Sequence, residues 1–511
     1  MARTLKQTAL VRMAPELRLN GREIHGRESA SEDIEELMSS ILTNTSAMVA
    51  LQTLRGVNND LATTQNEIAT GKTINTAKDN SAIWAISKVM ESDVLGFMAI
   101  SDSLNLGDST ISVARQASET ISDLLTDMKG RIVAAQEENV DRTKIQDDID
   151  ALTDQINSIV ETAQFNGLNL VKGSEDANIL GSLARGADGQ VTANEIRVAR
   201  QDLTTTAGVF GSTGDLAPNV TISDAGADAL SNAGNTAVLT LANNADYAAA
   251  NGALGLTVGG VAMNFIAGDL TGDQDNAAGQ VAARINALNI DGISASATGA
   301  AITITSTRAF ETADVVIDSE SGVTGQQVTE LNGTGSLTNG VGVVNSINER
   351  AESLTFDSAA VVEEGDGYRV SFGGETYTYV AGPNENFEDV AKGLQAAIGG
   401  GSLEGISTRI EQDDTSGDFV LKIDNDSATT KTIVVAGTQE GEASGGLFGL
   451  ETLNVETDTA AGNALNTIES LIDVAIDSAA AFGSVQGRIE LQAEFVSNLT
   501  DAFKAGIGSL V

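Results

Sequence analysis

Two long stretches, one toward each end of the chain, carry apolar residues at alternating intervals of three and four, and a glycine-rich middle separates them. Residues 38–172 contain no proline and only six glycines, whereas residues 173–462 hold 41 of the 53 glycines. A three–four spacing places apolar side chains on one stripe of an α-helix, and such a stripe is buried only against partner helices. The ends are therefore expected to be helical and to associate, leaving the middle displayed.

The stripes identify the residues expected to pack between helices. In the amino-terminal stretch they are Leu51, Leu54, Leu61 and Ile68, followed by Ile121, Leu125, Met128, Ile132, Ile149, Leu152 and Ile156. In the carboxy-terminal stretch they are Ile468, Ile472, Phe482 and Ile489. The predicted fold class is α+β, elongated and multidomain, with an antiparallel coiled-coil bundle built from both termini and a β-rich region inserted between them.

Composition excludes several classes of function. The 511 residues include 71 acidic and 29 basic side chains, and the resulting net charge of −42 would repel a nucleic acid backbone. There is no cysteine, and the single histidine, His25, cannot supply a catalytic triad or a zinc site. No run of about eighteen apolar residues is present to cross a bilayer. The sequence predicts no enzyme activity, no metal or cofactor, no nucleic acid partner and no membrane insertion.

Composition shifts also divide the chain. Residues 1–37 are rich in Arg and Glu and are read as a flexible leader, or as a misassigned start because Met38 begins the helical pattern. Residues 38–80 are expected to form a first helix and a turn, and residues 81–172 a helical bundle. Residues 173–462 form the β-rich insert, and residues 463–511 return to the helical style of the amino-terminal stretch.

The insert contains a predicted internal repeat. The glycine pairs at Gly259 and Gly373 are each followed by a helix-like segment and by alternating strand signal, so that residues 251–308 and 365–426 share one order of elements. Each is expected to be a strand–strand–helix–strand–strand unit. Chance similarity between glycine-rich segments is the weaker reading.

Four segments of the terminal stretches resemble bacterial flagellins. They are the segment that starts at Met38, the turn Ile74-Asn75-Thr76-Ala77-Lys78-Asp79-Asn80, the turn Gln164-Phe165-Asn166-Gly167, and Gly483-Ser484-Val485-Gln486-Gly487-Arg488. The signature residues within them are Asn75, Ala77, Lys78, Asp79, Asn166, Gly167, Gln486 and Arg488. The matches cover roughly the terminal stretches only, and the glycine-rich insert resembles the variable outer part of such proteins.

The resemblance implies a structural subunit that polymerises with itself into the extracellular flagellar filament. It also implies secretion by the flagellar export apparatus without a cleaved signal peptide, with an export chaperone and a filament cap as partners. Leu51, Leu54, Leu61 and Ile68 would then pack in the innermost shell of the filament. The other stripe residues would build the next shell, for which an ordinary intramolecular bundle is the alternative.

Two other readings remain open from the sequence. A hook–filament junction protein shares the helical termini, and a surface adhesin would use the central repeats. The family normally continues beyond the Arg488 motif with a helix that pairs with the amino-terminal one, so a chain that ends at Val511 is expected to be truncated and to assemble poorly.

Overall fold

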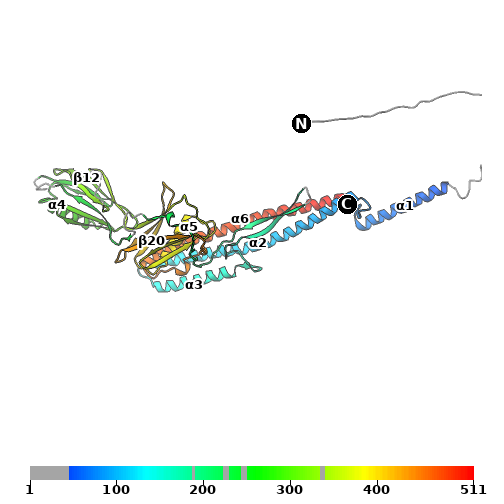
Figure 1. The fold of residues 1–511 in the computed structure, drawn as a ribbon, viewed down its shortest axis with the longest axis horizontal. Coiled ribbons are helices and arrows are strands. Elements are labelled where there is room, and N and C mark those ends of the chain that lie inside the picture. Colours follow the sequence, from blue (N-terminus) through cyan, green and yellow to red (C-terminus); the bar gives the residue numbers. More distant parts are fainter. Residues whose placement is uncertain (1–44, 187–189, 223–228, 243–249, 334–339) are drawn as a thin grey trace, which may run out of the picture. The chain divides into compact units, whose positions relative to one another are not determined.

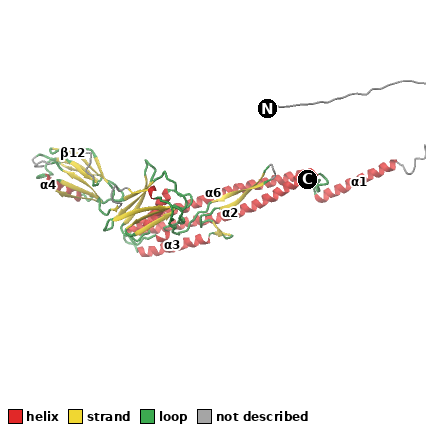
Figure 2. Ribbon diagram, in the orientation of Figure 1, coloured by secondary structure: helices red, strands yellow, loops and turns green. Residues whose placement is uncertain are grey.

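A computed structural model describes residues 45–186, 190–222, 229–242, 250–333 and 340–511, and the expected leader at 1–37 lies outside this description. The long helices lie toward the two ends of the chain, and two β-rich bodies, each with one short helix, are inserted between them (Figures 1 and 2). The chain divides into two compact units. One comprises residues 45–91 with Ala505–Val511, and the other comprises Ser92–Lys504.

The first unit contains helix α1 (Thr45–Thr70), a turn over residues 71–80 and the beginning of helix α2 (Ser81–Ala135). Gly71 ends α1 with a positive φ of 68°, which a residue with a side chain adopts only with strain. The turn is also tied to the far end of the sequence, because the Thr73 backbone N–H donates to the Val511 carbonyl at 2.5 Å.

Three helices form the frame of the second unit: α2, α3 (Arg142–Thr162) and α6 (Asp458–Leu510). α2 and α6 run antiparallel, since the α6 partner number falls as the α2 number rises. The rings of Phe97 and Phe503 meet edge to face at 5.3 Å, and the Lys129 ammonium lies 2.5 Å from the Glu469 carboxylate. Between them the Arg115 guanidinium donates to the Gln486 amide oxygen at 3.0 Å.

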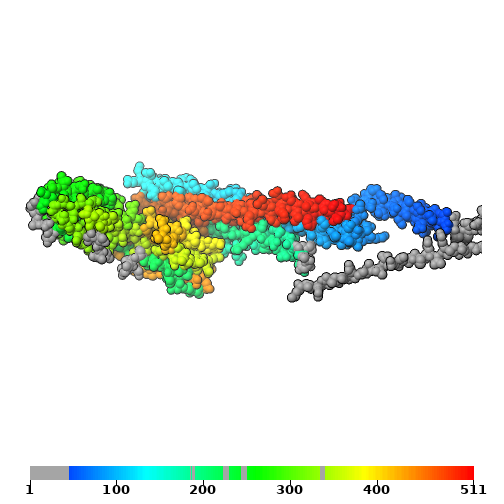
Figure 3. Space-filling view, turned by 90° about the horizontal axis from the view of Figure 1, so that it is seen from above, coloured from blue at the N-terminus to red at the C-terminus, as the bar shows by residue number. Residues whose placement is uncertain are grey.

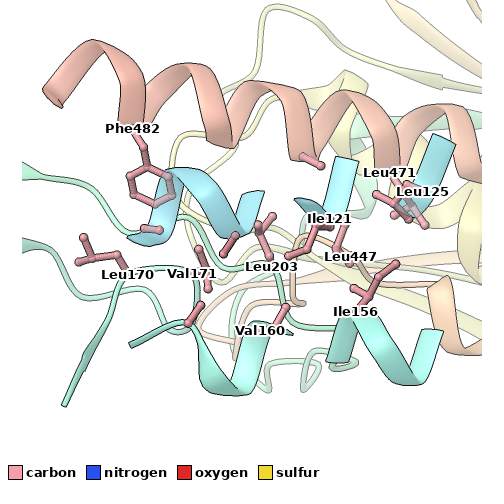
Figure 4. Close-up of a cluster of buried hydrophobic side chains, with 14 of the residues drawn as sticks. Ile121, Leu125, Ile156, Val160, Leu170, Val171, Leu203, Leu447, Leu471 and Phe482 are labelled. Atoms are coloured by element: carbon pink, nitrogen blue, oxygen red, sulfur yellow. The ribbon is translucent and has the colours of Figure 1, made fainter. Parts of the chain in front are cut away.

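The apolar stripes of these helices form one core (Figure 4). Leu125 of α2 lies near Leu471 of α6, while Ile156 and Val160 of α3 close the opposite side. From the segments that follow α3 and precede α6, Leu170 and Val171 lie beside Phe482, and Leu447 lies near Ile121. Burial of complete Leu and Ile side chains contributes about 1.5–3 kcal/mol each, which makes this core the main source of stability of the bundle.

Two hairpins follow α3. The short one pairs β1 (Gln164–Phe165) with β2 (Leu168–Asn169), and the long one pairs β3 (Ala177–Arg185) with β4 (Val191–Val198). The long hairpin lies along the helices, with the Gln492 side chain of α6 donating to the Gly181 carbonyl at 3.0 Å. Gly107 lets the hairpin approach α2, because a Cβ there would lie 2.5 Å from the Ile179 side chain. Figure 3 shows α6 with α3 and this hairpin on either side.

The inserted region leaves and re-enters the bundle through two antiparallel segments, residues 202–209 and 442–447, which we name the stem. Gly446 N–H donates to the Asp202 carbonyl at 2.8 Å, and Val209 and Glu442 exchange two hydrogen bonds of 2.9 Å. Gly445 is required by this close approach, since a Cβ there would lie 2.2 Å from the Thr204 carbonyl oxygen.

Beyond the stem lies a first β-rich body, the α5 module, made of residues 216–222, 229–230 and 352–438. Helix α5 (Phe387–Gly399) packs between two antiparallel four-stranded sheets of order β18-β19-β15-β5 and β17-β16-β20-β6. The strands are β5 (Val220–Ile222), β6 (Ala229–Leu230), β15 (Glu352–Phe356), β16 (Gly367–Phe372), β17 (Glu375–Val380), β18 (Ile406–Gln412), β19 (Phe419–Asn425) and β20 (Lys431–Thr438). Phe356, Tyr368 and Phe387 form an aromatic cluster at its centre.

The second β-rich body, the α4 module, comprises the described residues between 235 and 347. Helix α4 (Gln274–Ala287) covers two four-stranded sheets of order β10-β11-β7-β13 and β14-β12-β8-β9. The strands are β7 (Asn235–Thr240), β8 (Ala253–Val258), β9 (Val261–Phe265), β10 (Ile293–Thr298), β11 (Ala301–Ser306), β12 (Ala313–Ser321), β13 (Gln327–Leu331) and β14 (Val344–Ile347). Its core is aliphatic and separate from that of the α5 module.

The mixed helical and sheet composition agrees with the predicted α+β class. Within 251–308 the elements run β8-β9-α4-β10-β11, and within 365–426 they run β16-β17-α5-β18-β19. That the two segments repeat one another, and that the helices form a coiled coil, stay predictions. Helix α6 begins at Asp458, five positions before the expected start at 463, because Gly462 has open space around it and is accommodated in an early helical turn.

Candidate assembly surfaces

Helix α1 has an apolar face with no partner among the residues that the structure describes. None of its 26 residues is buried, and the exposed fraction of Leu54 is 58% and that of Ile68 is 78%. The large apolar side chains left exposed on α1 are Met48, Val49, Leu51, Leu54, Val57, Leu61 and Ile68. All four α1 residues predicted to pack in the innermost shell are in this set.

An isolated helix of this length is marginal in water, because helical stability in proteins comes largely from packing of an apolar face. Local contacts supply little here. Thr53, Thr63 and Thr70 direct their hydroxyls back to the carbonyls four residues earlier, at 2.9, 3.0 and 2.7 Å. α1 therefore presents a helix whose main source of stability lies outside the described chain.

The turn after α1 is organised by Asp79. Its carboxylate accepts hydrogen bonds from the backbone N–H of Asn75 at 3.2 Å and of Thr76 at 2.9 Å, and from the Thr76 hydroxyl at 3.1 Å. The backbone and hydroxyl bonds from Thr76 hold the pKa of the Asp79 carboxyl below its usual value. Of the other signature residues here, Ala77 and Lys78 are exposed on the turn. This carboxylate explains why the motif places an aspartate four residues after Asn75.

The turn also starts the next helix. Asn80 precedes α2 and its side-chain oxygen accepts from the backbone N–H groups of Ala82 and Ile83, both at 3.2 Å. Glu91, two turns further on, lies 3.3 Å from the Lys72 ammonium and 2.6 Å from that of Lys88. The hydrogen bond from Lys88 lowers the pKa of the Glu91 carboxyl. These contacts fix the direction in which α2 leaves the turn.

The predicted packing residues of α2, α3 and α6 are placed in the core of the chain's own bundle. Ile121, Leu125, Met128, Ile132, Ile149, Ile156, Ile468, Phe482 and Ile489 are buried, and Leu152 and Ile472 are partly buried against them. The structure therefore brings this set together in one core, and no residue of the α1 set is part of that core.

The remaining signature residues are dispersed over the second unit. Asn166 and Gly167 form the tight turn between β1 and β2, with φ of 50° and 84°. Gln486 of α6 accepts from Arg115 of α2 and so links the two long helices, whereas Arg488 is exposed.

A second group of exposed apolar residues was missed by the sequence reasoning. On the outer faces of α2 and α6 these are Ile86, Val89, Leu95, Met98, Leu106, Val133, Ile476, Leu491 and Phe495. These residues could have been found as large apolar side chains that lie outside the buried stripe of their helix. On α6, for example, Ile489 and Val496 belong to the stripe, whereas Leu491 and Phe495 do not.

One buried carboxyl group lies where α5 faces α6. Both oxygens of Glu385 accept from the Tyr379 hydroxyl, at 3.0 and 2.9 Å, and one also accepts from the Gly382 N–H at 2.9 Å. Burial raises the pKa of Glu385 to about 7. The groups that line the small cavity beside it include Asp389 and Lys392 of α5 and Ser470 of α6.

Within the described residues, no group of three or more His, Cys, Asp or Glu side chains is arranged to hold a metal ion. None of the described helices combines the length and apolarity needed to cross a bilayer.

Comparison with known proteins identifies the amino-terminal region. Residues 41–176 match the family model for the bacterial flagellin N-terminal helical region. The chain is 40% identical over 164 residues to Flagellin C of Rhizobium meliloti, an alignment that covers 31% of this chain and 51% of the relative. It is 41% identical over 172 residues to Flagellin FljK of Caulobacter vibrioides, covering 33% of this chain and 63% of the relative. The chain thus spans about half to two thirds of the length of these relatives.

Among solved structures, the flagellar hook associated protein-3 of Legionella pneumophila aligns over 83% of this chain and 98% of its own. The sequence identity is 10% and the TM-score is 0.32, a value too low to support an argument about fold or function.

Proposed function

We propose that this chain, whose residues 41–176 match the family model for the bacterial flagellin N-terminal helical region, is a structural subunit that polymerises into the filament of the bacterial flagellum. The observation that carries the proposal is the bare apolar face of α1, in a chain whose bundle stripes are already buried. The face formed by Leu51, Leu54, Val57, Leu61 and Ile68 is stabilised when another helix covers it. Copies of the same chain, packed side by side, supply such helices.

Two sets of contacts divide the work of assembly. The α1 face, with Leu51, Leu54, Leu61 and Ile68, packs against terminal helices of neighbouring copies. The exposed apolar residues of α2 and α6, such as Leu491 and Phe495, lie on other surfaces of the bundle and form lateral contacts. A contact between two different surfaces of identical chains generates a helical filament when the rotation between successive copies does not close a ring.

The location and route are further parts of this proposal. A flagellar filament subunit acts outside the cell, and the chain is delivered there through the flagellar export apparatus without a cleaved signal peptide. The net charge of −42 keeps the assembled filament soluble and keeps neighbouring filaments apart. No cofactor takes part, because polymerisation uses only packing and hydrogen bonds between copies.

The test is salt-induced assembly of the purified full chain, followed by electron microscopy. The Leu54→Asp variant introduces a charge into the α1 face and is expected to abolish filaments while the thermal melt of the subunit is unchanged. The matched control is Asn59→Asp, which adds the same charge on the side of α1 that is about half a helical turn around the axis from Leu61. This variant is expected to assemble. Filaments from the Leu54→Asp variant would refute the proposed role of α1. Short stacks that stop growing in the unmodified protein would favour a junction protein instead.

A further inference from the structure

Strand β9 is an edge of the α4 module, and its outer side has no hydrogen-bond partner among the described residues. In a two-residue hairpin the residues that flank the turn form a hydrogen-bonded pair, and such pairs then alternate along the strands. Val258 pairs with Val261 across Gly259–Gly260, so Val261, Met263 and Phe265 bond to β8. The backbone N–H and C=O groups of Ala262 and Asn264 consequently point away from the sheet, and both residues are exposed.

The other edges of the α4 module are closed by the chain itself. On β10, the Asn286 side chain accepts from the Ala295 N–H at 2.8 Å and donates to the Ala295 carbonyl at 2.7 Å, as a neighbouring strand would. The edges β13 and β14 lie against each other, and the Asn332 side chain donates to the Ser346 carbonyl of β14 at 3.2 Å.

Two edge strands of the α5 module are also contacted by other parts of the chain. The hydroxyl oxygen of Ser444 accepts from the Val380 N–H at 3.2 Å, and the Ser444 N–H donates to the Val380 carbonyl at 2.9 Å, so one end of edge strand β17 is covered by the stem. Asn463 and Asn466 of α6 donate to carbonyls of edge strand β18 at 2.9 and 3.3 Å. The open edge of β9 therefore differs from the edges β10, β13, β14, β17 and β18, each of which is contacted by another part of the chain.

The chemistry of β9 also lacks the usual protection. Exposed edge strands are normally guarded by charged side chains, by proline or by a bulge. The sequence has no charged residue and no proline between Asp246 and Asp269, and the β8–β9 register is regular. Ile266, at the end of the strand, is 66% exposed. In a chain of net charge −42, this uncharged edge is a surface that another copy can approach without charge repulsion.

We propose that β9 pairs antiparallel with β9 of a second copy of this chain, joining the two α4 modules into a continuous sheet. The spacing of the free groups is self-complementary, because Ala262 of each copy lies opposite Asn264 of the other and the two pairs form four hydrogen bonds. The same register places Ile266 beside Gly260 of the second copy, where no atom lies within 4 Å of a Cβ position. At the centre of the contact Met263 of each copy lies opposite Met263 of the other, on the buried face of the sheet, while Ala262 and Asn264 meet on the exposed face.

This pairing is a weak contact by itself, since one edge strand buries far less area than a stable dimer needs. It becomes effective wherever copies are held at high local concentration. It does not rest on the filament role, because two soluble copies at high concentration form it in the same register.

Cysteine cross-linking tests the register directly, because the native chain has no cysteine. The full-length Ala262→Cys and Asn264→Cys variants, one of them carrying an affinity tag, are mixed in the concentrated soluble state and oxidised. The mixed disulfide is expected to exceed both homodisulfides by about ten-fold, because only the 262–264 pair brings Cβ atoms within bonding range. Ser294→Cys mixed with Ser296→Cys, on the closed edge β10, is the control and is expected to give only statistical products.

Equal amounts of the three disulfides would overturn the pairing, and so would a cross-link peptide showing that β9 contacts another part of its own chain. Ala262→Asp, combined with the Asn264→Cys variant, is expected to reduce the mixed disulfide with Ala262→Cys to the control level, because it places an unpaired carboxylate opposite Asn264 of the other copy. A melt unchanged from that of the parent protein confirms that this variant remains folded.

Discussion

Helix α1 and the bundle helices α2, α3 and α6 carry the same kind of apolar stripe, but the stripe is exposed on α1 and buried on the bundle helices. The stripe residues of the bundle are nearly all buried, with Ile121 and Ile468 fully inaccessible. Those of α1 are all exposed by half or more. The same pattern therefore serves folding in one region and, by our proposal, association between chains in the other.

A heptad stripe predicts that a helix packs against another helix, but it does not show whether that second helix belongs to the same molecule. What differs is the rest of the chain: α2 and α6 run antiparallel over most of their length, and the segments around Leu170 and Leu447 complete their core. No such segment covers α1 in the described structure. Mutations that distinguish stability from assembly can break or sharpen this contrast.

The largest effect is expected from Phe482→Ala in the bundle. The Phe482 side chain is 1% exposed and fills the space beside Leu170 and Val171. Its removal leaves a cavity, and the free energy of unfolding should fall by about 3–5 kcal/mol in a denaturant titration. Phe495→Ala, on the same helix but 57% exposed, is the control and should change stability by no more than about 0.5 kcal/mol. Equal effects would show that the bundle core is not where stability resides.

A smaller effect, dependent on pH, is expected from Glu385→Gln where α5 faces α6. The pKa of Glu385 is raised from 4.5 to about 7, so the folded state binds this proton more tightly than the unfolded state does. Stability from this group is thus greatest below pH 4.5 and is lost as the pH rises to about 7, by an amount on the order of 3 kcal/mol.

The amide oxygen of a glutamine can still accept from Tyr379 and Gly382, so Glu385→Gln should be the more stable form above pH 7. The measurement is denaturant unfolding at pH 5 and at pH 8. The burial that raises the pKa of Asp389 acts in the same direction, so the variant should reduce the pH slope without removing it. An identical slope in variant and parent would contradict the assignment to Glu385.

Asn80→Ala should have an intermediate and local effect at the junction of the two regions. It removes the side chain that caps the first turn of α2, and capping residues contribute about 1 kcal/mol. Hydrogen exchange should report faster exchange at Ala82 and Ile83 and unchanged protection in α3. Ser81→Ala, one residue further on, is the control for a change of side chain at the same helix end. Increased exchange throughout α3 would show that the cap supports the whole bundle.

The smallest effect on stability is expected from Leu61→Ala on the α1 face. Because Leu61 is 54% exposed and contacts no core, the free energy of unfolding of the subunit should change by no more than about 0.5 kcal/mol. By the proposed function, the protein concentration needed for filament growth should nevertheless rise several-fold. A large loss of subunit stability would mean that α1 is packed against its own chain, and the contrast between the two regions would disappear.

Sequence periodicity carried most of the helical information. The turn at residues 71–80 follows from the loss of the apolar period, and the core positions of α2 and α6 follow from the alternation of threes and fours. The period does not distinguish partners, so the burial of Ile121 and the exposure of Leu54 were not predictable from it. The outward Leu491 and Phe495 were missed because they lie off the stripe.

In the insert, glycine pairs such as Gly259–Gly260 and Gly373–Gly374 mark hairpin turns that the structure contains, each with two positive φ angles. The assembly of strands into four sheets was not predictable, because β5 pairs with β15 and β7 with β11 across long sequence separations. The closure of β10 depends on a single side chain, Asn286, which no pattern of hydrophobicity records.

The stem joins the two ends of the insert to each other before either reaches the bundle. The length of the insert therefore has little effect on the stability of the helical bundle, because loop closure costs only about 0.6 kcal/mol for each doubling of length. The stem, residues 202–209 and 442–447, is consequently a position at which a longer, shorter or unrelated domain can replace the native one. The inserted domain can in this way be replaced while the helical bundle that carries it stays the same.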